Sequence, residues 1–182
     1  MTPGPRDILD FWFKDVGEKR WFESDPKLDA ALRVRFEQTW HAARDGKLSD
    51  WEETATGALA LLIVLDQFPR NMFRGRAEAF STDAPARAAA DRALARGFDL
   101  EAPKGARIFF YLPFMHSENL ADQDRCVALV RERLGEDSMN FPYAVAHRDW
   151  IRRFGRFPGR NAALGRVATP EETIFLAENK VP

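Results

Sequence analysis

The sequence has one cysteine, three histidines and almost no excess of charge of either sign, and these scarcities exclude several classes of protein. Cys126 has no second cysteine with which to form an internal disulfide, which fits a reducing compartment and predicts a cytoplasmic protein. The 27 basic and 28 acidic side chains nearly balance, whereas a general nucleic-acid binder normally carries a basic excess. Nucleic acid is therefore not an expected partner.

Long apolar runs and the motifs of common catalytic sites are also lacking. The longest apolar run, residues 58–65, is far too short to span a bilayer, and no apolar stretch of signal-peptide length opens the chain. Neither a Cys/His ligand pattern nor an H-E-x-x-H motif occurs, and there is no phosphate-binding glycine loop, dinucleotide fingerprint or nucleophile elbow. We therefore expect no membrane partner, no metal and no cofactor.

Aromatic and aliphatic residues, by contrast, are abundant. Hydrophobic residues make up 45% of the chain, and 15 Phe and five Trp predict a core of large side chains. No stretch alternates apolar and polar residues, and helical spacing recurs throughout. The 182 residues therefore predict a single all-α domain over 1–182, built from seven or eight helices as antiparallel neighbours, with no sheet.

The clearest helix is expected between Asp25, a capping residue, and Gly46, which can end a helix in the left-handed conformation. Its apolar residues recur every four positions: Leu28, Leu32, Phe36 and Trp40. Further helices are expected at 5–13, 51–67, 82–97, 103–113, 117–134 and 140–154, and after the Thr169–Glu172 capping box. The helix over 51–67 is expected to break at or near Pro69, because proline lacks the N–H that continues a helix.

Arginines are concentrated in "IRRFGRFPGRNAALGR", residues 151–166, which contains five of them together with three glycines and a proline. Guanidinium groups are planar donors that hold carboxylates or phosphates through two bonds at once. Three interpretations stay open. In the first, acidic side chains of the third and sixth expected helices, at 51–67 and 117–134, pair with the guanidinium groups. In the second, a bound anion pairs with them. In the third, the segment is a solvated loop.

Buried acids provide the expected partners of such arginines. Asp66 ends the most apolar segment and needs a partner if it is buried, either in a local ion pair with Arg70 and Arg74 or while orienting an arginine toward a ligand. Glu118 and Asp122 are four residues apart, which places both on one helix face if Ser117 caps that helix. Arginines from 151–166, a metal ion or a shared proton would each relieve their repulsion, and we favour the arginines.

Two histidines flank the same predicted helix interface. His147 lies on an apolar stripe, a position more typical of a core residue than of a ligand, and His116 lies just before the sixth helix. Convergence of the two histidines with Glu118 and Asp122 would give the groups needed for acid–base catalysis.

The segments "LDQFPRNMFRG", "YLPFMHSENLADQD" and "AHRDWIRRFGRFPGRNAALGR…TPEETIFL" together resemble the bacterial domain-of-unknown-function family 924 over nearly the whole chain. The resemblance implies an all-helical fold similar to tetratricopeptide-like helical hairpins, and it transfers no reaction. The family's usual Phe-Pro-His-Arg-Asn stands here as "FPGRN", with Gly159 in place of the histidine. The positions within its motifs are Asp66, Gln67, Arg70, Asn71, Arg74, His116, Ser117, Glu118, Asp122, Gln123, His147, Phe154, Gly155, Arg156, Arg160, Asn161 and Arg166.

The functional hypothesis is a binding module for a small anionic molecule or an acidic peptide end, with its residues converging on one concave face of stacked helical hairpins. The expected ligand-binding residues are Asp66, Arg70, Asn71, Arg74, Arg156, Arg160, Asn161 and Arg166. One alternative is a hydrolase-type acid–base enzyme in which Glu118 or Asp122 is the base and His116 or His147 shuttles the proton. The other alternative is a purely structural ion network.

Overall fold

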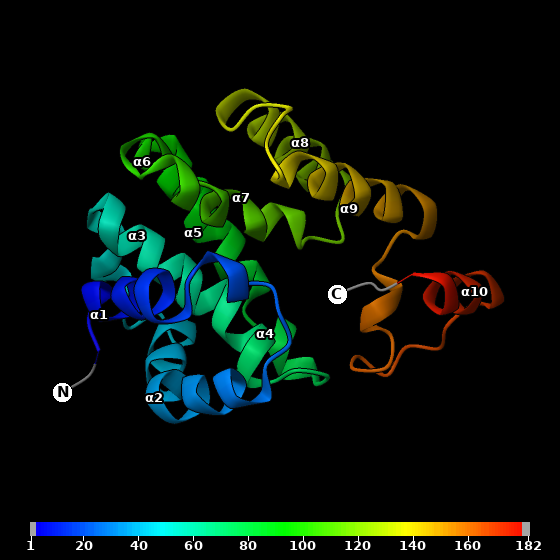
Figure 1. Ribbon diagram of the computed structural model, residues 1–182, viewed down its shortest axis with the longest axis horizontal. Helices are drawn as coiled ribbons and strands as arrows, with labels where there is room; N and C mark the ends of the chain where they lie inside the picture. Colours follow the sequence, from blue (N-terminus) through cyan, green and yellow to red (C-terminus); the bar gives the residue numbers. More distant parts are fainter. Residues whose placement is uncertain (1–2, 180–182) are drawn as a thin grey trace. The chain divides into compact units, whose positions relative to one another are not determined.

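The computed structural model describes residues 3–179, and over this range the chain is helical with no strand (Figure 1). The helices are α1 (Pro5–Asp10), α2 (Pro26–Arg44), α3 (Ala55–Leu62), α4 (Phe68–Met72), α5 (Asp83–Ala95), α6 (Phe98–Glu101), α7 (Ile108–Met115), α8 (Leu120–Arg133), α9 (Asn140–Phe154) and α10 (Pro170–Glu178). The predicted all-α class is confirmed. None of the described helices combines the length and apolar character that crossing a membrane requires.

The chain divides into two compact units. The first unit contains the residues up to Arg74 together with residues 78–113, and the second contains residues 75–77 and the chain from Phe114 onward. The boundary falls inside α7, directly after Pro113. The single domain and the tetratricopeptide-like stacking expected from the sequence stay predictions.

An aromatic core holds the first unit together, as the composition predicts. The fully buried Phe36 on α2 lies with its ring centroid 5.0 Å from that of Phe11 and 5.1 Å from that of Phe68 on α4. Trp21 and Phe109 meet edge to face at 4.9 Å. Such pairs add to the free energy that area burial already contributes. The stripe expected on α2 is likewise confirmed, since its four predicted apolar residues are all buried.

The helix does not break at Pro69 itself but ends at Met72, and a distant side chain explains its passage through the proline. The chain stays helical from α3 through a π-helical turn, Ile63–Gln67, and then through α4 to Met72. Pro69 has no N–H to donate to the carbonyl of Leu65, four residues earlier. The hydroxyl of Thr82 donates to that carbonyl oxygen instead, at 2.5 Å, so the buried acceptor is satisfied.

In the second unit, α8 and α9 lie side by side as an antiparallel pair, with α10 beyond a turn-rich segment (Figure 1). The predicted start of α9 at Asn140 is confirmed, and so is the Thr169–Glu172 capping box of α10. The predicted cap of α8 is wrong. Asn119, and not Ser117, accepts the N–H of Ala121 at 2.8 Å, and α8 begins at Leu120.

Thr82 gives a direct test of the helix continuation through Pro69. Thr82→Val removes the donor to the carbonyl of Leu65 and the acceptor of the Trp40 indole N–H, which lies 3.2 Å away. Because both partners are buried, we expect the free energy of unfolding to fall by about 2 kcal/mol, measured by urea denaturation. Thr82→Ser keeps the hydroxyl and should lower the free energy of unfolding much less. Equal stability of Thr82→Val and the wild type would contradict this explanation.

Candidate functional site

The predicted site residues of the first unit form two ion-pair groups. Asp66, only 1% exposed, accepts from Nη2 of Arg70 at 3.2 Å, and the same nitrogen donates to Asp83 at 2.9 Å. The amide of Gln67 also donates to Asp66. The local ion pair expected for Asp66 and Arg70 is therefore present, and Asp83 is a second acid that the sequence analysis missed.

Arg74 pairs with Asp29 and not with Asp66, the acid that the sequence indicates. Its Nε and Nη2 donate to Asp29 on α2 at 2.9 and 3.1 Å, and the amide of Asn71 donates to the same carboxylate at 2.9 Å. Asp29 thereby joins α4 to α2. Both groups belong to the first unit, whereas the other predicted site residues belong to the second. The expected convergence of all of them on one face stays a prediction.

Glu118 is the first of two carboxylates that organise the second unit. Arg166 holds it through Nη1 at 2.7 Å and Nη2 at 3.0 Å, and the N–H of Phe157 donates to it at 2.8 Å. Partial burial alone would raise the pKa of Glu118. The hydrogen bonds from Arg166 and Phe157, with the charges of Arg166 and Arg160, outweigh that effect and lower the pKa.

The expected common helix face of Glu118 and Asp122 is wrong, because Glu118 precedes α8 and Asp122 lies in its first turn. Asp122 instead accepts from the hydroxyl of Ser117 at 2.6 Å. Arginine pairing, the interpretation favoured from the sequence, is confirmed for Glu118.

Glu172 is the second organising carboxylate, and it is 2% exposed. Arg156 holds it through Nε at 2.7 Å and Nη2 at 2.8 Å. The backbone N–H of Thr169 donates to it at 2.7 Å and the amide of Asn161 at 3.2 Å. The hydrogen bond from Arg156 is the largest influence on this carboxyl, and its pKa is lowered to about 2. Sequence analysis identified Glu172 as part of a capping box and missed its role as the partner of Arg156.

Acids also meet the arginines at the end of α9. Arg152 donates to Asp124 on α8 at 2.9 Å, and Arg153 donates to Glu171 on α10 at 2.7 Å. Arg160 donates to the main-chain oxygen of His116 at 2.8 Å and lies over the ring of Phe157. Carboxylates therefore do pair with arginines of this segment, and α10 supplies two of them, Glu171 and Glu172.

His147 is a buried residue of α9, as its place on the apolar stripe predicts. Its Nδ1 lies 2.8 Å from the carbonyl oxygen of Tyr143, and the rings of Trp150 and Phe157 pack against it. Among residues 3–179, no three side chains of His, Cys, Asp or Glu are grouped so as to hold a metal ion. A joint catalytic role of His116, Glu118, Asp122 and His147 stays a prediction.

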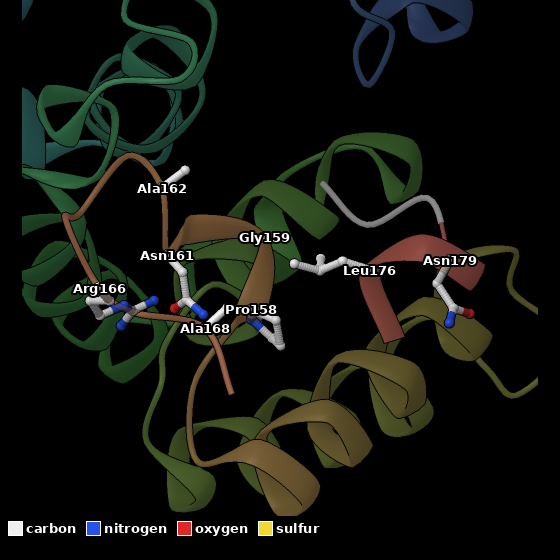
Figure 2. Close-up of a pocket in the computed structure, with 8 residues that line it drawn as sticks. All are labelled: Pro158, Gly159, Asn161, Ala162, Arg166, Ala168, Leu176 and Asn179. Carbon is white, nitrogen blue, oxygen red and sulfur yellow. The ribbon is translucent and has the colours of Figure 1, made fainter. Parts of the chain in front are cut away.

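A cavity of about 510 Å³ opens beside this ion network in the second unit (Figure 2). It is lined by Pro158, Gly159, Asn161, Ala162, Arg166, Ala168, Leu176 and Asn179. In Figure 2 the side chains of Asn161 and Arg166 lie next to each other, and Leu176 points from α10 toward the segment that carries Pro158 and Gly159. Two of the predicted ligand-binding residues, Asn161 and Arg166, thus line one cavity.

A closed backbone turn brings Asn161 and Arg166 together. The N–H of Arg166 donates to the carbonyl of Asn161 at 2.8 Å, and the N–H of Gly165 donates to that of Ala162 at 3.3 Å. Gly165 has a φ of 63°, the left-handed conformation that this helix-ending motif requires. The glycine of "NAALGR" is the sequence signal that could have placed the two side chains side by side.

Each of these two side chains has one buried polar atom with no hydrogen-bond partner among the described residues. The atoms are Oδ1 of Asn161 and Nε of Arg166. Asn161 as a whole is 3% exposed. A buried polar atom without a partner costs about 1–3 kcal/mol, so each of these two side chains carries one such cost inside the second unit.

The depressed pKa of Glu172 predicts how its ion pair depends on pH. The folded-state pKa of about 2 lies below the ordinary 4.5, so the pair stabilises the fold above pH 4.5 and loses that effect as the pH falls toward 2. Glu172→Gln should therefore lower the free energy of unfolding by about 3 kcal/mol at pH 7, with a smaller difference from the wild type at pH 3. Urea denaturation at several pH values measures both.

Glu171→Gln is the matched control, because the ion pair of Glu171 with Arg153 is exposed and should contribute little. If Glu172→Gln lowered the free energy of unfolding by the same amount at pH 7 and at pH 3, that result would contradict the lowered pKa of Glu172.

Comparison with known proteins places the chain in a family. The sequence model described as "Bacterial protein of unknown function (DUF924)" matches residues 8–180. Among solved structures, the protein of unknown function ATU0120 from Agrobacterium tumefaciens is similar, with 44% identity and a TM-score of 0.90 over 96% of this chain and 97% of that one. No protein of curated function matches the chain. The chain belongs to the DUF924 family of bacterial proteins, as the three motif segments indicate.

Proposed function

We propose that the second unit is a binding module that holds a small molecule with an anionic, oxygen-bearing group in the cavity beside Asn161 and Arg166. One observation carries the proposal. Asn161 and Arg166, two of the residues predicted to bind a ligand, line the same cavity, and Arg166 gives that wall a positive charge. The charge of the guanidinium favours an anionic group in the cavity.

The ion network supports this proposal by fixing the guanidinium in place. Nη1 and Nη2 of Arg166 are held by Glu118, and Nη2 also donates to the carbonyl of Phe157 at 3.1 Å. These bonds leave the side chain little rotational freedom, so a ligand would not have to order it on binding. Such preorganisation is what a binding site requires of its polar groups.

The remaining wall fits an organic molecule. Pro158, Ala162, Ala168 and Leu176 present apolar surface, and the volume of about 510 Å³ lies in the range of small-molecule sites. Gly159 also lines the cavity and adds no side chain to it. Apolar walls with a few placed polar groups are typical of ligand-binding cavities.

A structural ion network is the second candidate, and the pairing of the arginines favours it. Both Arg156 and Arg166 meet a carboxylate through two nitrogens, as Arg74 does in the first unit. Under this hypothesis the ion pairs serve stability alone, and no small anion binds.

Filling the cavity separates the two candidates. In a thermal-shift screen of small organic carboxylates and inorganic phosphate, the proposal predicts that at least one anion raises the Tm of the wild type, because it binds only the folded state. Leu176→Trp places a large ring in the cavity without touching the ion pairs, and it should abolish the shift.

Ile174→Trp is the matched control, since Ile174 lies on the same helix, is 61% exposed and does not line the cavity. It should keep the full shift. If no anion raises the Tm of the wild type, the binding proposal fails and the structural network stands. A shift that survives Leu176→Trp would place the binding elsewhere.

A further inference from the structure

The cavity in the second unit presents accessible carbon atoms to a ligand. Leu176 and Ala168 are partly exposed and Ala162 is exposed, so their side chains are accessible at the cavity wall. By contrast, Nε of Arg166 and Oδ1 of Asn161 have almost no accessible surface. A ligand therefore gains most by covering carbon atoms, because the free energy gained from apolar burial is roughly proportional to the area removed from water.

The charges around the cavity favour a ligand with a single negative group. Of the eight described residues that line the cavity, Arg166 alone is charged. Glu118 already pairs with its Nη1 and Nη2, so the attraction left for a ligand is partial. The neighbouring pair of Arg156 with Glu172 adds no excess of either sign. A second negative charge on the ligand would find no further cation in this wall to pair with.

The charged and the apolar parts of the wall are separated. In Figure 2, Arg166 lies to the left of Asn161, whereas Pro158 and Leu176 lie to its right. Gly159 follows Pro158 in the wall and has no side chain that would narrow the cavity there. A molecule that reaches both parts carries its charge at one end and an apolar chain at the other.

Building on the proposed function, we infer that the ligand is a monocarboxylic acid with a hydrocarbon chain, a class of which short fatty acids are the simplest members. Its carboxylate lies on the side of Arg166, and its chain covers Leu176 and Pro158. The chain supplies most of the affinity, because Glu118 already compensates part of the charge of Arg166.

A series of straight-chain acids tests this inference by calorimetric titration of the wild type. Butanoate, hexanoate and octanoate carry the same charge and differ only in chain length. We expect the affinity to rise about 2- to 4-fold for each added methylene, the gain for burying part or all of that group. Octanedioate, which ends in a second carboxylate, should bind more weakly than octanoate.

Variants of two α10 residues assign the chain to the cavity. Leu176→Asn replaces the apolar contact by a polar side chain of similar size, and it should reduce the gain per methylene. Ile174→Asn is the matched control, because Ile174 is 61% exposed and does not line the cavity, and it should keep the full gain. The series on the wild type needs no variant, so a misfolded Leu176→Asn would not remove the test.

The outcomes separate the inference from the proposed function. An affinity that stays constant with chain length overturns the inference and leaves the proposed binding of an anion intact. Tighter binding of octanedioate or inorganic phosphate than of octanoate also overturns the inference alone, and so does a gain per methylene that a folded Leu176→Asn retains in full. If none of these anions binds, the inference and the proposed function both fail.

Discussion

The second unit depends on one buried carboxylate, that of Glu172. It accepts from Arg156 at the end of α9, from the N–H of Thr169 at the start of α10, and from Asn161 in the turn between them. A charge this deeply buried is tolerated only when its oxygens are fully hydrogen-bonded. The need to solvate this carboxylate therefore joins three segments of backbone, in addition to the packing of Trp150 and Phe154 against Phe175.

Glu118 is held in the same way as Glu172. Each carboxylate binds one guanidinium through two nitrogens and one backbone N–H: Phe157 for Glu118 and Thr169 for Glu172. Arg156 and Arg166 likewise donate to main-chain oxygens, of Val167 and Phe157. Side-chain charges thus stabilise the irregular backbone of 155–169, where no regular helix satisfies it. This explains why arginine and glycine are concentrated in the same segment.

Local signals were sufficient to predict some elements and insufficient for others. The four-residue spacing of α2 and the capping box of α10 lie within single helices, and both were predicted correctly. The helix through Pro69 depends on Thr82, whose contribution only the folded chain reveals. The partners of Arg156 and Arg166 lie 16 and 48 residues away, so sequence could indicate that these arginines need acids but could not choose the acids.

Structural pairing and ligand binding do not exclude each other at Arg166, because the side chain that holds Glu118 also lines the cavity. Nη1 and Nη2 hold Glu118, and Nε is buried with no hydrogen-bond partner among residues 3–179. A lysine carries its three N–H donors on a single nitrogen and lacks the planar fork that holds a carboxylate through two nitrogens. The Asn161 amide likewise uses one end only. Its NH₂ group donates to Glu172, and its oxygen has no hydrogen-bond partner among the described residues. The ion pairs that stabilise this unit therefore also fix the positions of two side chains that line the cavity.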